Sequence, residues 1–123
     1  MIKVLIVDDS IFSQKTTESL LLKNLEDVEI YKASDGQEGF TKYTEILPDY
    51  VVLDLLMPKI NGLELIKLIN EYYGNAKIFV LSADVQKNIR EEAEALNIMQ
   101  FINKPFNQEK AQILCDMIRN GVN

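Results

Sequence analysis

Residues 50–58 read Tyr-Val-Val-Leu-Asp-Leu-Leu-Met-Pro, an apolar run that contains a single carboxylate. Residues 50–53 are continuously hydrophobic, which is typical of a parallel strand covered on both faces. Asp54 stands where this strand should end, and Pro58 disfavours helix before it, so a loop is expected to follow. In an open α/β sheet, ligands bind outside the carboxyl ends of the strands. Asp54 is therefore either a helix cap or a reactive group, and this stretch alone does not decide between them.

The rest of the chain alternates short apolar runs with longer segments of helical spacing. Turn and cap residues separate them, among them Ser34-Asp35-Gly36 and Asn61-Gly62. The segment 28–33 is more polar than the others, which favours a place near a sheet edge. The predicted strands are residues 2–7, 28–33, 50–53, 77–81 and 99–103, and the predicted helices are residues 12–25, 37–46, the segment from Asn61-Gly62 to about 73, 85–96 and the segment between Asn107 and Gly121.

Four of the predicted helices carry groups of apolar residues, of which those on the third are available for burial and those on the fourth and fifth each share one face. These are Phe12, Leu20, Leu21 and Leu25 on the first, Leu65, Ile66, Leu68, Ile69 and Tyr72 on the third, Val85, Ile89, Ala93 and Leu96 on the fourth, and Ala111, Leu114, Cys115 and Ile118 on the fifth. Five strand–helix repeats predict a doubly wound α/β fold, with three layers, α/β/α, around a five-stranded parallel sheet. With 123 residues, we expect one domain over residues 1–123.

Composition excludes several functions. The formal net charge of −6 argues against direct nucleic-acid binding, which needs clustered Lys and Arg. The chain has no His and one Cys, which excludes imidazole catalysis and makes a zinc site a poor fit. No apolar stretch is long enough to span a membrane, and no signal peptide is recognisable, so we expect no membrane insertion and a cytoplasmic, reducing location.

Polar residues follow four of the predicted strands at the point where each strand ends. Asp8-Asp9 follows the first strand, Asp54 the third, Ser82 the fourth and Lys104 the fifth. These ends meet at one edge of a parallel sheet, where three carboxylates would repel one another without a divalent cation, for which Mg²⁺ is the best candidate. Lys104 suits a phosphate or carboxylate oxygen, and Ser82 offers a hydroxyl donor. The set predicts phosphoryl chemistry, with Asp54 able to act as the nucleophile.

Each of these groups also has a plainer interpretation. Asp8-Asp9-Ser10 is typical of a helix N-terminus, Ser82 of a helix cap, and Lys104 of a solvated surface lysine. The combination is more specific than its parts, because four strand ends each carry a group that metal-assisted phosphoryl transfer needs.

Four motifs, in order along the whole chain, carry a resemblance to a known family. They are Val7-Asp8-Asp9-Ser10, Leu53-Asp54-Leu55-Leu56-Met57-Pro58 with Asn61-Gly62, Leu81-Ser82-Ala83, and Phe101 through Lys104-Pro105-Phe106. The sequence resembles the receiver domains of response regulators, the CheY-like family of two-component signal transduction. The resemblance implies the flavodoxin/CheY-like fold with strand order 2-1-3-4-5.

The resemblance also implies roles for individual residues. Asp54 matches the phosphoacceptor, which would become an aspartyl phosphate, and Lys104 and Ser82 match the groups that contact the phosphoryl group. Asp8 and Asp9 match the pair that binds Mg²⁺ directly or through water, with Asp54 and the backbone carbonyl of Leu56 as further ligands. Phe101 matches the switch aromatic that moves inward when Ser82 is drawn to the phosphate. Lys104-Pro105 matches a peptide bond that is cis in most members of the family.

This sequence departs from the family pattern at a few positions. Phe101 stands where Tyr is frequent, and Ser82 where Thr is commoner. Leu56 and Asp84 occupy the positions that tune hydrolysis of the phosphoryl group. Leu56 is apolar and cannot orient an attacking water, so slow self-dephosphorylation is expected.

The function that the resemblance implies is a phosphorylation-dependent switch. A histidine kinase or phosphotransfer protein would supply the phosphoryl group, and the face of the fourth helix, fifth strand and fifth helix would then bind an output protein. The expected pathway is chemotaxis or motility, with a motility component or a dedicated phosphatase as partner. The protein would assist its own phosphorylation and dephosphorylation without being a conventional enzyme, as a monomer or a phosphorylation-dependent dimer.

Three alternatives stay open. The first is a receiver domain excised from a longer DNA-binding response regulator. The second is a pseudo-receiver that serves as an interaction module and is never phosphorylated. The third is a flavodoxin-like cofactor binder, against which Asp8-Asp9 argues, because it stands where a phosphate-binding loop would be needed.

Overall fold

The computed structural model describes residues 1–83 and 86–121. Strands and helices alternate along the chain, as the apolar pattern predicted. The strands are β1 (Ile2–Val7), β2 (Val28–Ala33), β3 (Tyr50–Leu53), β4 (Ile78–Ser82) and β5 (Gln100–Asn103), and the helices are α1 (Ile11–Asn24), α2 (Gly36–Ile46), α3 (Gly62–Tyr72), α4 (Lys87–Ala95) and α5 (Gln108–Arg119).

The five strands form one parallel sheet in the order β2-β1-β3-β4-β5. Both the doubly wound architecture and the strand order are confirmed. The more polar β2 lies at an edge of the sheet, as its composition indicated. The three inner strands are buried almost throughout, which explains their continuous hydrophobic runs.

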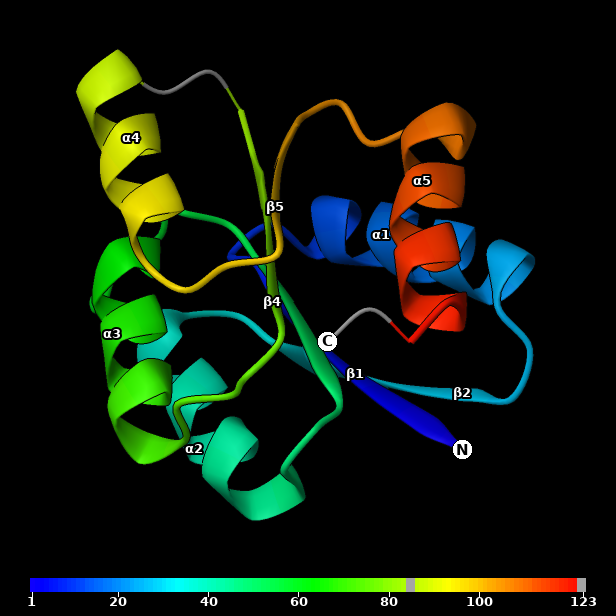
Figure 1. Ribbon diagram of the computed structural model, residues 1–123, viewed down its shortest axis with the longest axis horizontal. Coiled ribbons are helices and arrows are strands. Elements are labelled where there is room, and N and C mark those ends of the chain that lie inside the picture. Colours follow the sequence, from blue (N-terminus) through cyan, green and yellow to red (C-terminus); the bar gives the residue numbers. More distant parts are fainter. Residues whose placement is uncertain (84–85, 122–123) are drawn as a thin grey trace.

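Helices cover both faces of the sheet and divide the core into two halves. In Figure 1, α2, α3 and α4 lie on one side of the sheet, and α1 and α5 lie on the other. Successive residues of a strand point to opposite faces, so Val51 and Leu53 pack beneath α2 and α3, whereas Tyr50 and Val52 pack beneath α1 and α5. The predicted apolar stripe of α5 is confirmed: Ala111, Leu114, Cys115 and Ile118 are all buried.

Four of the five helices begin with a side-chain cap. Ser10, Asp35, Asn61 and Asn107 each accept a hydrogen bond from the backbone N–H three residues later, at the start of α1, α2, α3 and α5. These caps fix where each loop at the carboxyl edge of the sheet becomes a helix. By contrast, α4 has Gln86 at this position and no side-chain cap.

Two of the apolar residues named above are exposed, and for Tyr72 this differs from the burial that we expected. Phe12 is 81% exposed, because α1 turns Gln14, Thr17 and Leu21 toward the sheet instead. Tyr72 is 52% exposed, because it is the last residue of α3 and its ring makes only edge-to-face contacts, with the rings of Phe40 and Tyr43.

The fourth helix also differs from its prediction. It was expected over residues 85–96 and is observed over Lys87–Ala95. Ala93 is buried and Ile89 and Leu96 pack partly against the core, whereas Val85 lies outside the described residues. Among the helices of the described chain, none has the length and apolar character needed to cross a membrane.

Candidate functional site

The ends of four neighbouring strands bring the predicted site residues together at the carboxyl edge of the sheet. β1 and β3 end in register, so Asp8 and Asp54 each stand one residue beyond the paired ends. Ser82 closes β4, and Lys104 follows the last residue of β5. The topology therefore places two carboxylates, a hydroxyl and an ammonium at one edge, although 96 positions separate Asp8 from Lys104.

Lys104 bridges the two buried carboxylates. Its Nζ donates to Asp8 Oδ2 at 2.9 Å and to Asp54 Oδ2 at 3.1 Å. Asp8 is 4% exposed and Asp54 6%, so water screens their charges poorly. Burial lowers the pKa of Lys104, but the hydrogen bond to Asp8 and the charges of Asp54 and Asp8 outweigh it, and the net shift is upward. Lys104 is therefore a permanent cation at neutral pH.

The other carboxylate oxygen of Asp54 is held by two donors. Oδ1 accepts from Ser82 Oγ at 2.8 Å and from the backbone N–H of Leu56 at 3.0 Å. Ser82 is fully buried, so its hydroxyl is turned toward Asp54 and not toward solvent. Hydrogen bonds from three different segments thus fix the orientation of the Asp54 carboxylate.

Asp9 adds a third, exposed carboxylate to the cluster. One oxygen from each of Asp8, Asp9 and Asp54 lies within 4.8 Å of the other two. A set of hard oxygen ligands that is open to solvent on one side suits Mg²⁺, which prefers carboxylates and retains several waters. The donor chemistry therefore fits a magnesium ion.

Hydrogen bonds distinguish the plainer interpretations from the functional ones. Ser10 is the residue that caps α1, through a 3.2 Å bond from the Ser13 N–H to its Oγ. Asp8 supports this turn with Oδ1, which accepts from the Ser10 N–H at 2.9 Å, while its Oδ2 contacts Lys104. Ser82 contacts Asp54 and caps none of the helices in the described part of the chain, and Lys104 is not a free surface lysine.

Phe101, the predicted switch residue, is buried, at 4% exposure. The structure already shows the inward placement that we expected to follow phosphorylation, and in the same structure Ser82 Oγ donates to Asp54 Oδ1. The guanidinium of Arg90 on α4 covers the Phe101 ring, with Cζ 4.7 Å from the ring centroid. The movement of Phe101 stays a prediction.

Three further positions follow from the resemblance. The Lys104–Pro105 peptide bond is cis, as predicted. The Leu56 side chain is 52% exposed beside the acid cluster, and the role of its carbonyl stays a prediction. Asp84 lies outside the described residues.

Sequence reasoning missed buried polar residues of α1 that lie next to the site. Gln14 and Thr17 of α1 are buried, at 5% and 2% exposure. Their spacing with Leu21 is a helical one, but a polar residue on an inward face cannot be told from a surface residue without the tertiary contact. Arg90 was missed for the same reason.

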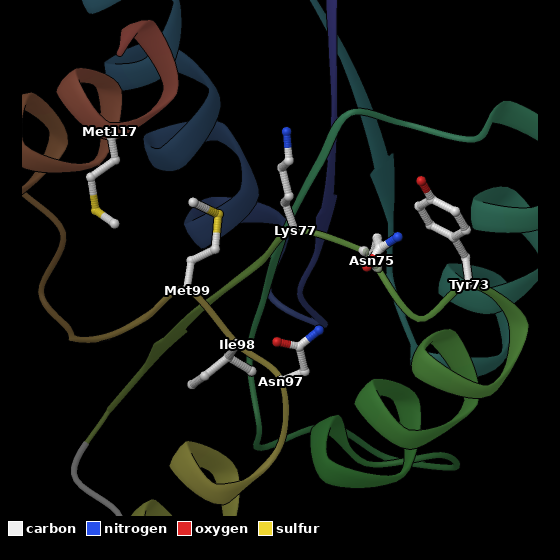
Figure 2. Close-up of a pocket in the computed structure, with 8 residues that line it drawn as sticks. Tyr73, Asn75, Lys77, Asn97, Ile98, Met99 and Met117 are labelled. Atoms are coloured by element: carbon white, nitrogen blue, oxygen red, sulfur yellow. The ribbon is translucent and has the colours of Figure 1, made fainter. Parts of the chain in front are cut away.

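One cavity of the described chain lies at the opposite edge of the sheet. It has a volume of about 560 Å³, and Figure 2 shows its lining at the start of β4 and β5 and on α5. Tyr73, Lys77, Asn97 and Met117 are among its residues. None of the predicted site residues lines this cavity, so we do not assign it to the acid cluster.

Comparison with known proteins gives the family. The model of the response regulator receiver domain matches residues 4–116. The chain belongs to the response regulator receiver family. The chemotaxis protein CheY of Thermotoga maritima is 39% identical over 104 residues, covering 85% of this chain and 86% of that protein.

Among the other similar proteins, the matching part is a portion of a longer chain or one chain of a complex. A protein-glutamate methylesterase/protein-glutamine glutaminase of Geobacter sulfurreducens is 32% identical over 114 residues, but this chain covers only 30% of its length. A crystal structure of a CheX–CheY–BeF3–Mg²⁺ complex from Borrelia burgdorferi contains a chain with a TM-score of 0.86 and 29% identity, covering 99% of this chain and 90% of that one. The receiver fold, and the signalling class to which receivers belong, are therefore shared with chemotaxis proteins.

Proposed function

We propose that this receiver is a phosphorylation-controlled signalling switch whose phosphoacceptor is Asp54. The observation that carries the proposal is the Asp54 carboxylate, buried at the carboxyl edge and contacted by both Lys104 and Ser82 beside two further acids. A structural carboxylate would not require an ammonium, a hydroxyl and an acid pair from three other strand ends.

The phosphoryl group would come from a phosphohistidine of a histidine kinase or a phosphotransfer protein. This chain has no His and so cannot carry that donor itself. A carboxylate oxygen of Asp54 attacks phosphorus, the P–N bond breaks, and the imidazole leaves and takes up a proton. Lys104 holds its positive charge beside the transferred oxygens, and Ser82 donates a hydrogen bond to one of them. The chain thus assists its own phosphorylation and, with water as the attacking group, its own dephosphorylation.

Asp8, Asp9 and Asp54 would hold Mg²⁺, together with the Leu56 carbonyl that the family resemblance adds. When bound, the ion neutralises charge that accumulates on the phosphoryl oxygens during transfer. It also removes the repulsion among the three carboxylates, which Lys104 alone only partly offsets.

The output surface would be the face formed by α4, β5 and α5. Phosphorylation adds close to two negative charges and strong acceptor oxygens at Asp54. Transfer of the Ser82 hydrogen bond to a phosphoryl oxygen would hold Phe101 inward and bias the attachment of α4 through Arg90. The partner would be an output protein of chemotaxis or motility, or a dedicated phosphatase, in the cytoplasm. CheY relatives and a CheX–CheY complex support this choice.

A second candidate is the same switch serving as the receiver domain of a longer protein. The relatives that this chain covers only in part favour it, including the methylesterase of Geobacter sulfurreducens. In that setting, the α4–β5–α5 face would contact an attached domain and not a separate protein.

Phosphorylation by a small P–N donor tests the proposal. The protein is incubated with phosphoramidate, with Mg²⁺ or with a chelator, and the phosphorylated fraction is separated by ion exchange. We expect Mg²⁺-dependent phosphorylation of the wild type, none of Asp54→Asn, and wild-type behaviour of Asp49→Asn, an exposed acid outside the site. Equal phosphorylation of Asp54→Asn and the wild type would overturn the assignment.

A further inference from the structure

Gln14 is a buried amide that joins three segments behind the acid cluster. It lies on α1, is 5% exposed, and donates from Nε2 to the Asp8 carbonyl at 2.6 Å. The same nitrogen lies 3.3 Å from the Ala33 carbonyl at the end of β2 and 3.2 Å from Ser34 Oγ in the next loop. A buried amide with such partners is costly to remove, because its acceptors would lose their hydrogen bonds.

The short bond to Asp8 acts on the peptide that joins the two acids. The Asp8 N–H already donates to the Ala33 carbonyl at 3.0 Å, so the bond from Gln14 fixes the Asp8 backbone on its other side. The Asp8 carbonyl belongs to the Asp8–Asp9 peptide plane, whose orientation determines the position of the Asp9 Cα atom. Gln14 therefore holds the peptide plane from which Asp9 extends.

Asp9 depends on this backbone more than Asp8 does. Asp8 has its own side-chain contacts, to Ser10 and Lys104. Across residues 1–83 and 86–121, no hydrogen bond or ion pair in the structure fixes the exposed Asp9 carboxylate directly. Its place within 4.8 Å of the other two acids thus follows from the backbone that carries it.

We propose that Gln14 is a positioning residue for the cation site: its amide orients the Asp8–Asp9 peptide so that both carboxylates converge on Mg²⁺. This inference rests on the proposed function, because it assumes that the cluster binds the ion. The amide is neutral, so it acts through geometry and adds no positive charge that would compete with the cation. A residue with a merely structural role would affect the stability of the fold and leave the affinity for Mg²⁺ unchanged.

Gln14→Met tests the role, because methionine keeps the length of the side chain and removes its donors. The chain has no Trp, so Mg²⁺ is titrated by following backbone ¹H–¹⁵N signals, and stability is measured by urea unfolding. We expect the Kd for Mg²⁺ to rise about tenfold, the lower end of what partners that orient a metal ligand contribute. The control is Leu21→Val, two turns along the same buried face of α1, which should lower stability and keep the wild-type Kd.

The wild-type protein provides a second measurement that does not depend on the variant folding. The two side-chain Nε2–H signals of Gln14 should shift during the Mg²⁺ titration with the same midpoint as the Asp9 amide. Side-chain signals that stay fixed would overturn the inference, as would an unchanged Kd in Gln14→Met or an equal rise in Leu21→Val. A wild type that does not bind Mg²⁺ at Asp8, Asp9 and Asp54 would instead refute the metal part of the proposed function, and the inference with it.

Discussion

At the level of single residues, the site depends on one ammonium between two buried carboxylates. Lys104 contacts Asp8 and Asp54 at hydrogen-bond distance, and its side chain is 21% exposed. The arrangement stabilises the fold only while all three charges are present, because an unpaired buried carboxylate is expensive. A bound Mg²⁺ would supply positive charge to the same two acids. Lys104 and the ion would therefore partly replace each other and compete for the carboxylates of Asp8 and Asp54.

This competition predicts the behaviour of Lys104→Met. Without Mg²⁺, the substitution should lower the free energy of unfolding by about 2 kcal/mol, since it leaves Asp8 and Asp54 without their cation. Added Mg²⁺ should restore more stability in the variant than in the wild type. Urea unfolding with and without Mg²⁺ measures both effects, and Lys87→Met, whose side chain is 91% exposed, is the control. A smaller response to Mg²⁺ in Lys104→Met than in the wild type would contradict the competition.

The pH dependence of the same pair of proteins follows from the upward shift of the Lys104 pKa. The pKa of the folded chain lies above the unfolded value of 10.5, so the stability contributed by Lys104 is complete below that value and is lost as pH rises through the folded pKa. The difference in unfolding free energy between the wild type and Lys104→Met should therefore stay constant near neutral pH and shrink above 10.5. If the difference in unfolding free energy already shrinks between neutral pH and 10.5, the two acids do not keep the Lys104 side chain protonated.

At the level of the elements, α4 is the helix with the weakest attachment to the described chain. Only Ala93 of this helix is fully buried, and Gln86 provides no side-chain cap. Arg90 compensates in part, since its guanidinium lies over the Phe101 ring and its Nε lies 3.5 Å from Glu94. The contact ties α4 to β5, so the helix on the proposed output face is held by the proposed switch residue, Phe101.

Arg90→Gln should therefore loosen α4 while leaving the sheet intact. A cation–π contact at a partly exposed site contributes about 0.5–1 kcal/mol, which corresponds to hydrogen exchange about twofold to fivefold faster in α4 amides. Amide exchange followed by NMR measures this, and Lys87→Gln on the same helix is the control. Unchanged exchange in Arg90→Gln, or equal acceleration in the control, would show that Arg90 does not anchor the helix.

The elements also show which features the sequence could predict. Strands covered on both faces have continuous apolar runs, so β1, β3 and their terminal carboxylates were found directly. Parallel pairing then required those ends to meet, which predicted the cluster of Asp8, Asp54, Ser82 and Lys104 before any contact was known. Inward polar residues such as Gln14 carry no such signal, because their partners are backbone carbonyls that only the tertiary fold brings near.

At the level of the whole molecule, the proposed switch depends on the division of the core into two halves. Phe101 belongs to the half beneath α2, α3 and α4, and Ile102, the next residue, to the half beneath α1 and α5. A change at the carboxyl edge that alters Phe101 therefore reaches helices on one face first. Ser82 already donates a hydrogen bond to Asp54. Phosphorylation is therefore expected to transfer this hydrogen bond to a phosphoryl oxygen and to restrict Phe101 to fewer conformations.

The most direct test of this switch is a comparison of backbone ¹H–¹⁵N NMR shifts before and after addition of Mg²⁺ and beryllofluoride, an analogue of the phosphoryl group. We expect shifts at Asp8, Asp9, Ser82 and Lys104, and beyond them at Phe101 and along α4. The Ser82→Ala variant should still bind the analogue at Asp54 but show smaller shifts at Phe101 and α4. Shifts confined to the residues around Asp54, with Phe101 and α4 unchanged in the wild type, would contradict the account.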